Sequence, residues 1–144
     1  MSGRRIRQVI AGRPVHTMPS STTVAAAAQQ MASANIGAML VVDGGELVGI
    51  FTERDALGRV LAKGVDPKRA TLAEVMTAKP LTVSADKQLI HALIIMHENG
   101  FRHMPVTDGG KLAGMVSVRD ALGNEMNELS GNLAKLESLS ENIR

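Results

Sequence analysis

The sequence predicts an α+β fold in which a short β-α-β-β-α unit occurs twice and the two copies pack with pseudo-twofold symmetry. The first observation is an internal repeat, because residues 39–58 match residues 104–123 at 12 of 20 positions without a gap. The second is the alternation of helix-forming stretches with short apolar runs in each copy. The third is a heptad-like leucine pattern near the end, which predicts an additional C-terminal helix.

The first copy, residues 9–62, is expected to begin with a short strand near residues 15–18. Residues 22–34 are rich in strong helix formers and predict the first helix. Two apolar runs then flank Asp-Gly-Gly at residues 43–45, which predicts a hairpin because glycine supplies the positive φ of a tight turn. A second helix is expected after the hairpin.

A linker, residues 63–70, contains Gly-Val-Asp-Pro and separates the copies. The second copy, residues 71–125, repeats the order of the first, with a strand near residues 81–83 and a helix that ends before Gly100. Its hairpin turn is Asp-Gly-Gly at residues 108–110. We expect the two copies to pack sheet to sheet and to share a core.

The C-terminal stretch, residues 122–144, predicts an amphipathic helix. Its large apolar residues recur at intervals of three and four: Leu122, Met126, Leu129, Leu133, Leu136, Leu139 and Ile143. Such a stripe is buried either on the chain's own domain or on a partner, and we favour a homodimer contact. With this helix, residues 1–144 are expected to form one module.

The composition excludes several classes of function. Without cysteine the chain has no disulfide, thiolate metal site or thiol nucleophile. The only aromatic residues are Phe51 and Phe101, which argues against nucleic-acid binding by base stacking. Neither a membrane span nor a secretory signal is expected, so the predicted location is cytoplasmic. Residues 1–13 carry four arginines and no acid, so this arm is either solvated or a contact for nucleic acid or membrane, and we favour solvation.

A hydroxyl residue and an aspartate recur three positions apart after each hairpin, as Thr52 and Asp55 and as Ser117 and Asp120. In a structural interpretation the hydroxyl caps a helix and the acid suits the helix dipole. In a functional interpretation the helix N-terminus binds phosphate, and the carboxylate accepts hydrogen bonds from two adjacent sugar hydroxyls. A nucleotide contains both groups, and the two interpretations remain open at this point.

The duplicated Gly-apolar-apolar-Thr/Ser-x-x-Asp phrase resembles the cystathionine-β-synthase (CBS) domain, which occurs in pairs. The Asp-Gly-Gly-x-Leu-x-Gly turn and the phrase Gly-Phe-Arg-His-Met-Pro-Val at residues 100–106 are similar to that family too. The resemblance covers residues 9–125. It implies a non-catalytic regulatory module and energy sensor that binds AMP, ADP or ATP between the repeats; other members bind S-adenosylmethionine or NAD.

The resemblance also implies roles for individual residues. Asp55 and Asp120 would bind ribose hydroxyls, while Thr52 and Ser117 would bind phosphate. The other implied residues are Arg102 and His103 at the phosphate, Thr17 and Thr82 at the adenine edge, Met39 and Met104 in the adenine lining, and Arg54 and Arg119 as assisting cations or surface salt-bridge partners. Since Gly37 and Ala38 stand in the first copy where Arg102 and His103 stand in the second, the first cleft is expected to lack a cationic phosphate ligand.

Two alternatives remain: an NAD-binding member, and a ligand-free dimeric assembly module. An enzyme is not expected, because Ser117, His103 and Asp120 lack the nucleophile elbow that would accompany a catalytic triad. A metal is not expected either, since His91 and His97 are six residues apart and do not share a helical face. The sequence does not identify the regulated partner protein.

Overall fold

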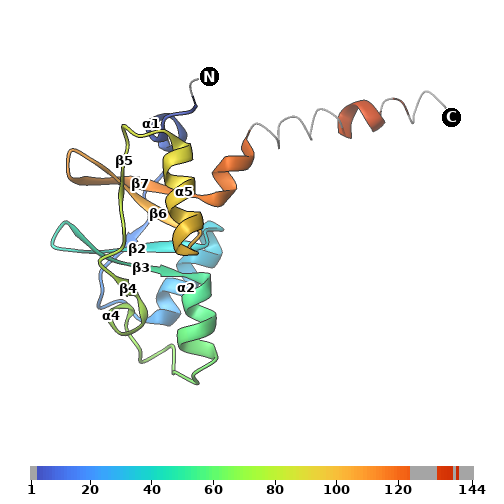
Figure 1. Cartoon of the computed structure of the whole chain (residues 1–144). Helices are drawn as coiled ribbons and strands as arrows, with labels where there is room; N and C mark the ends of the chain where they lie inside the picture. The colour runs from blue at the N-terminus through green and yellow to red at the C-terminus, as the bar shows by residue number, and fades with distance from the viewer. Residues whose placement is uncertain (1–2, 124–132, 138, 140–144) are drawn as a thin grey trace.

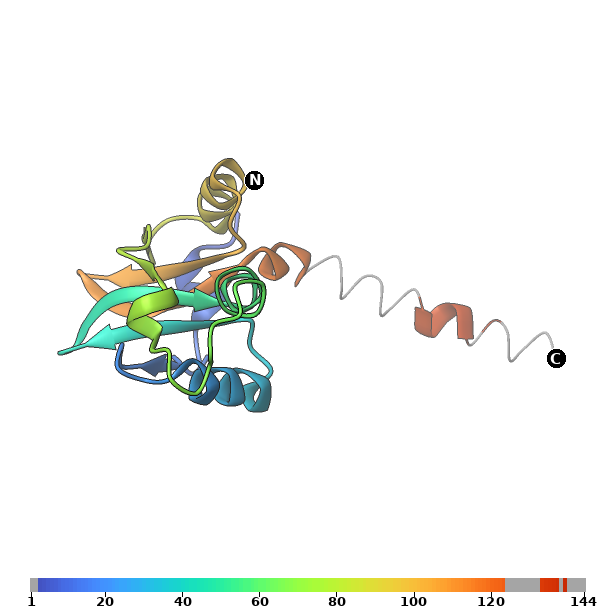
Figure 2. The ribbon, with the colours of Figure 1, turned by 90° about the horizontal axis from the view of Figure 1, so that it is seen from below.

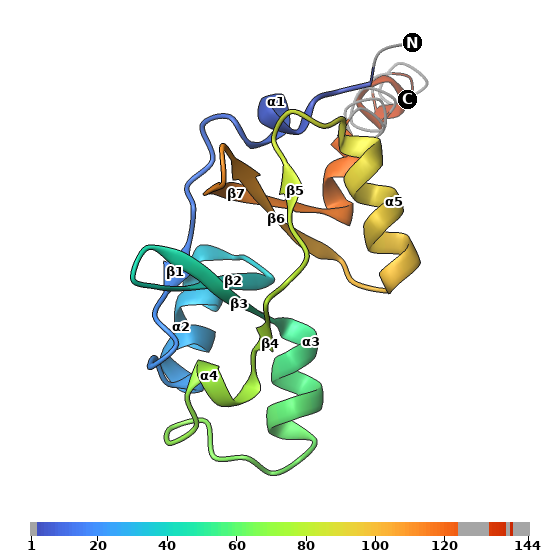
Figure 3. The ribbon, with the colours of Figure 1, turned by 60° about the vertical axis from the view of Figure 1, so that its left-hand side comes forward.

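A computed structural model describes residues 3–123, 133–137 and 139, and it confirms an α+β fold built from two repeats (Figure 1). The first sheet has the order β1 (Thr17–Met18), β2 (Ala38–Asp43), β3 (Glu46–Thr52) and β4 (Thr77–Ala78). The second sheet has the order β5 (Val83–Ser84), β6 (His103–Asp108) and β7 (Lys111–Ser117). In Figure 3 the second repeat lies above the first.

The helices follow the predicted order. The first repeat contains α2 (Val24–Ala34) and, after its hairpin, α3 (Glu53–Asp55), which continues as a π-helix over Ala56–Leu61. The second repeat contains α5 (Leu89–Asn99) and, after its hairpin, a 3₁₀ helix over Val118–Leu122. The remaining helices are α1 (Ile6–Ile10) before the first repeat and α4 (Leu72–Val75) after the linker.

Both hairpin turns have the predicted geometry. Gly44 and Gly45 have φ values of 57° and 80°, and Gly109 and Gly110 have 59° and 83°. Two consecutive positive φ angles define the type I′ turn, whose twist matches that of the paired strands. The turns therefore fix the register of β2 with β3 and of β6 with β7.

The hydrophobic residues form one core for each repeat and a smaller cluster between the sheets. Along β2, Met39 and Val41 face the helices of the first repeat, whereas Ala38 and Leu40 belong to the cluster between the sheets. This alternation is the period of two that a strand imposes. The expected shared core is therefore limited to the small cluster, and most apolar burial lies within each repeat.

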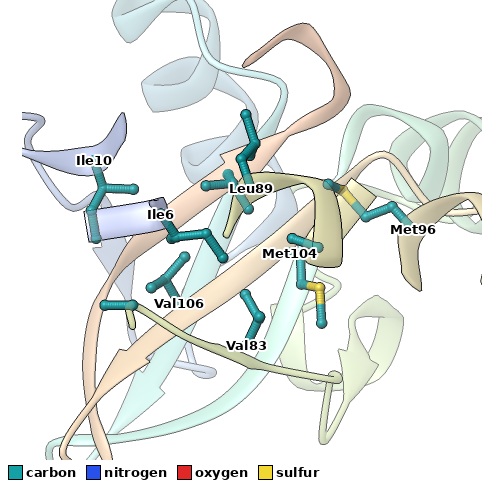
Figure 4. Close-up of a cluster of buried hydrophobic side chains, with 10 residues drawn as sticks. Ile6, Ile10, Val83, Leu89, Met96, Met104 and Val106 are labelled. Atoms are coloured by element: carbon teal, nitrogen blue, oxygen red, sulfur yellow. The ribbon is translucent and has the colours of Figure 1, made fainter. Parts of the chain in front are cut away.

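Helix α1 precedes the first repeat in sequence but packs on the second. Ile6 and Ile10 lie in the same buried cluster as Val83 and Leu89 (Figure 4). The chain then crosses to the first repeat through residues 11–16 and returns to the second through the segment between β4 and β5 (Figure 3). The repeat boundaries 9–62, 63–70 and 71–125 remain predictions.

The N-terminal arginines are bound to the second repeat, so the expectation of a merely solvated arm is wrong for them. Arg7 forms ion pairs with Asp86 at 2.7 Å and with Asp108 at 2.6 Å. Arg5 donates to the Asp86 carbonyl oxygen at 2.6 Å. These contacts satisfy the guanidinium groups beside α1 and hold this helix in place.

The described part of the C-terminal stretch is helical over residues 133–137, and this helix lies apart from both sheets in Figures 1 and 2. Leu133, Leu136 and Leu139 are exposed. The predicted stripe also includes Met126, Leu129 and Ile143, which lie outside the described residues. Within the described ranges, the helices are too short or too polar to cross a bilayer.

Candidate functional site

Two clefts open at the junction of the repeats, and each contains one of the predicted hydroxyl and carboxylate pairs. The first cleft, with Thr52 and Asp55, has a volume of about 520 Å³. The second cleft, with Ser117 and Asp120, has a volume of about 530 Å³. Both volumes are typical of sites for small molecules.

Each cleft is built from both repeats. The first combines the pair that follows β3 with Pro80, in the crossing to the second repeat, and with Pro105 on β6. The second combines the pair that follows β7 with residues 13–16, in the crossing to the first repeat, and with Leu40 on β2. Leu40 and Pro105 occupy equivalent positions in the two repeats, so the pseudo-twofold symmetry relates one cleft to the other.

Thr52 and Ser117 are the N-cap residues of the helices that begin beside them, as the structural interpretation predicts, and the two aspartates add hydrogen bonds to these caps. Asp55 Oδ2 accepts a hydrogen bond from the Thr52 N–H at 3.0 Å, and Thr52 Oγ1 accepts one from the Asp55 N–H at 3.2 Å. Asp120 Oδ2 accepts from the Ser117 N–H at 2.8 Å. Because these caps use only Oδ2, each carboxylate keeps its Oδ1 for another donor.

The environment of Oδ1 differs between the clefts. Asp55 Oδ1 lies 3.7 Å from Arg59 Nε, on the same helix. Asp120 Oδ1 lies 2.7 Å from Nη2 of Arg13, which belongs to the segment that runs from α1 to the first repeat. The Asp55 and Asp120 side chains are only 13% and 9% exposed, so both carboxylates are held in largely buried positions.

The clefts meet at a junction, the group Gly37, Glu53, Arg102 and His103, whose members line both of them. The sequence-based expectation that the first cleft lacks a cation at the phosphate position is therefore wrong. His103 begins β6 and Arg102 directly precedes it, and the packing of the repeats places both in the lining of the cleft that contains Asp55 as well as the cleft that contains Asp120. Arg54 and Lys79 add positive charge to the first cleft.

Gly37 leaves space at the junction that the Glu53 side chain occupies. A Cβ at this position would overlap the Glu53 carboxylate and would lie 3.2 Å from His103 Nε2. The glycine thus allows a carboxylate and an imidazole to approach the same point from opposite repeats. Any side chain at position 37 would displace one of them.

The surroundings of His103 lower its pKa and so favour the neutral imidazole. Burial is the main cause that lowers its pKa below the ordinary value, and the positive charges of Arg119 and Arg102 lower it further. The negative charges of the Glu53 and Asp120 carboxylates raise the pKa of His103 and partly oppose this shift. The junction therefore contains the guanidinium of Arg102, the carboxylate of Glu53 and an imidazole whose neutral form is favoured, and Arg119 adds a second guanidinium on the side of the second cleft.

Four of the predicted lining residues do not line the clefts. Met39 and Met104 are buried in the cores of their repeats, because alternation along the strand turns them toward the helices (Figure 4 for Met104). Thr17 and Thr82 also lie outside the lining of both clefts. The predictions for Met39 and Met104 are therefore wrong.

The residues that follow these methionines, Leu40 and Pro105, line the clefts instead, together with their partners on the paired strands, Ile50 and Met115. Ile50 and Pro105 line the first cleft, and Leu40 and Met115 line the second. Side chains alternate between the two faces of a strand, so the residues next to the core positions in each apolar run could have been identified from the sequence as cleft residues. Phe101, one of the two aromatic residues, also lines the first cleft.

The remaining predicted residues divide between the clefts. Arg54 lines the first and donates from Nη1 to the Gly100 carbonyl oxygen at 2.9 Å, whereas Arg119 lines the second. Ser117, His103 and Asp120 share the second cleft, but the Asp120 carboxylate is bound by the Ser117 N–H and by Arg13. Within the described residues, no three His, Asp or Glu side chains are grouped for a metal ion.

Comparisons with known proteins agree with this architecture. The family model for the CBS domain matches twice, over residues 6–62 and 72–126. A CBS domain-containing protein from Arabidopsis thaliana is 35% identical over 107 residues, which are 74% of this chain but 19% of that relative. The chain therefore spans about a fifth of the length of this curated relative.

Solved structures are similar as well. A protein with CBS domains from Burkholderia ambifaria has 34% sequence identity and a TM-score of 0.80, over 85% of this chain and 94% of that one. A CBS domain protein from Pyrobaculum aerophilum, complexed with AMP, has 25% identity and a TM-score of 0.74, over 81% of this chain and 88% of that one.

Proposed function

Because the chain belongs to the CBS-domain family, we propose that it is a non-catalytic regulatory module that binds adenosine nucleotides, AMP, ADP or ATP, in its two clefts. The observation that carries the proposal is the position of Asp55 and Asp120. Each is a largely buried carboxylate in a cleft, with Oδ2 engaged in a cap and Oδ1 outside the cap; Asp55 Oδ1 has no hydrogen-bond donor among the described residues, and Asp120 Oδ1 accepts from Arg13 on the wall of its cleft. Such an oxygen accepts strong hydrogen bonds from sugar hydroxyls.

The rest of each cleft suits the other parts of a nucleotide. Arg102 at the junction is common to both clefts and supplies positive charge for phosphate. Ile50, Leu81 and Pro105 give the first cleft an apolar wall for a flat base. The structure from Pyrobaculum aerophilum, which contains AMP, supports the choice of adenine.

Isothermal titration calorimetry of the full chain with AMP, ADP, ATP and GMP tests the proposal. We expect at least one adenine nucleotide to bind with a dissociation constant below millimolar and GMP to bind more weakly. If none of the adenine nucleotides produces a binding heat, the proposal fails and the ligand-free assembly module is favoured.

A dinucleotide such as NAD is a second candidate, favoured by the shared junction. Since Gly37, Glu53, Arg102 and His103 line both clefts, one ligand could place a nucleoside in each cleft and its two phosphates between them. In an added calorimetric titration with NAD, such a ligand would bind at one molecule per chain, whereas AMP would fill both clefts at two molecules per chain. The molar ratio therefore distinguishes the two candidates.

We further propose that the protein is a homodimer that regulates a partner protein in the cytoplasm. The exposed leucines of the C-terminal helix, Leu133, Leu136 and Leu139, support a contact between chains, because leucines at such spacing are typical of paired helices. A solution mass of two chains by light scattering is expected, and a mass of one chain would contradict the dimer.

A further inference from the structure

The two ribose-binding candidates, Asp55 and Asp120, are equivalent in sequence but not in their partners. Both use Oδ2 to accept a backbone N–H three residues earlier, at 3.0 Å and 2.8 Å. At Asp120, however, Oδ1 already accepts a hydrogen bond from Arg13 Nη2 at 2.7 Å. At Asp55 the nearest guanidinium nitrogen, on Arg59, is 3.7 Å from Oδ1, beyond hydrogen-bond distance.

Arg13 is held in this position by the segment that carries it. Helix α1 is anchored by Ile6 and Ile10, both buried in the core of the second repeat (Figure 4). On the other side of α1, Arg4 donates from Nη2 to the Asp120 carbonyl oxygen at 2.6 Å. Two arginines that flank one anchored helix thus bind the carbonyl and the carboxylate of a single residue.

The crossing that lines the first cleft lacks this arrangement. Lys79 precedes Pro80 there, as Arg13 precedes Pro14 in the crossing that lines the second cleft. Within the described part of the chain, Lys79 has no carboxylate within ion-pair distance. The acceptor oxygen is therefore open in the first cleft and occupied in the second.

We infer that Arg13 distinguishes the two clefts: its ion pair with Asp120 competes with the ribose hydroxyls, so the first cleft binds a nucleoside more tightly than the second. A ligand in the second cleft must replace a charge-assisted hydrogen bond that is already formed, whereas a ligand in the first cleft gains its bond without that loss. The inference rests on the proposed function, because it concerns how the same two clefts bind the same class of ligand.

The test uses adenosine, which has no phosphate, so that loss of a positive charge does not itself weaken binding. An Asp55→Asn substitution in the full chain leaves the second cleft to be measured by calorimetry. In this background Arg13→Gln is expected to raise the affinity for adenosine by at least about tenfold, since it frees Asp120 Oδ1. Arg13→Lys keeps the charge but loses the planar guanidinium and is expected to give a smaller increase.

Arg5→Gln is the matched control, because Arg5 lies on the same segment but binds the Asp86 carbonyl oxygen away from both clefts, and it should leave the affinity unchanged. Circular dichroism would verify that each variant is folded. If adenosine binds the first cleft in an Asp120→Asn variant but Arg13→Gln gives no gain or a loss in the second, the inference about Arg13 is wrong and the proposed function stands. If adenosine binds no variant in either cleft, the inference about Arg13 is wrong, and the separate titrations with AMP, ADP and ATP decide the proposed function.

Discussion

Replacing both Asp55 and Asp120 by Asn is expected to weaken the binding of AMP by at least about tenfold in each cleft. The substitution keeps an oxygen that can accept the N–H of Thr52 or Ser117, so the helix caps survive. It removes the charge and one acceptor, and a hydrogen bond to a charged group contributes about 1.5–3 kcal/mol. Calorimetry with AMP measures the loss.

The matched control for this variant is Asp66→Asn, in the linker and outside both clefts. Asp66 also accepts a backbone N–H, from Lys68 at 3.0 Å in a turn, so the control removes a charge from a carboxylate with the same kind of backbone hydrogen bond. It is expected to leave the affinity for AMP unchanged. An unchanged affinity in the Asp55 and Asp120 double variant, with the protein folded, would show that the carboxylates do not bind the ligand.

Replacing Phe51 by Ala is expected to lower the free energy of unfolding by about 3–5 kcal/mol. Phe51 is fully buried and is the largest buried side chain of the first repeat, packed in the same cluster as Met39 and Val41. Removal of the ring would leave a cavity within this cluster, and the surrounding side chains relax only partly into such a space. A loss of this size is a large share of the 5–15 kcal/mol that stabilises a typical domain.

Urea unfolding followed by far-ultraviolet circular dichroism measures this effect, since the chain has no Trp or Tyr for fluorescence. Leu61→Ala is the control, because Leu61 is 69% exposed on the π-helix and its truncation is expected to cost less than about 0.5 kcal/mol. A loss below 1 kcal/mol for Phe51→Ala would indicate that the first-repeat core is not packed as described.

The elements of the fold could be predicted because their signals are local. Gly44 and Gly45 specify a turn by their own conformational freedom, and the recurrence of the turn at Gly109 and Gly110 shows that the unit is duplicated. The pairs Thr52 with Asp55 and Ser117 with Asp120 are also local, because a cap spans three residues. Both pairs line the clefts, and their role in binding a ligand stays a prediction.

The cleft walls could not be predicted from the same local signals. Which repeat supplies a wall depends on the crossings of the chain, and an alignment of one copy with the other does not show that Arg102 and His103 reach both clefts. The error at Met39 and Met104 had a different cause. The apolar runs identify the strands, but the face of each residue follows only once the core side of the sheet is known.

The central claim is that the Asp55 and Asp120 carboxylates bind the ribose hydroxyls of an adenosine nucleotide. Calorimetric titration of the unmodified full chain with AMP and, separately, with 2′-deoxy-AMP tests it most directly, because the two ligands differ only in one hydroxyl group. We predict that AMP binds at least about tenfold more tightly, since the deoxy ligand leaves a buried charged acceptor without its donor. Equal affinities for the two ligands would contradict the claim.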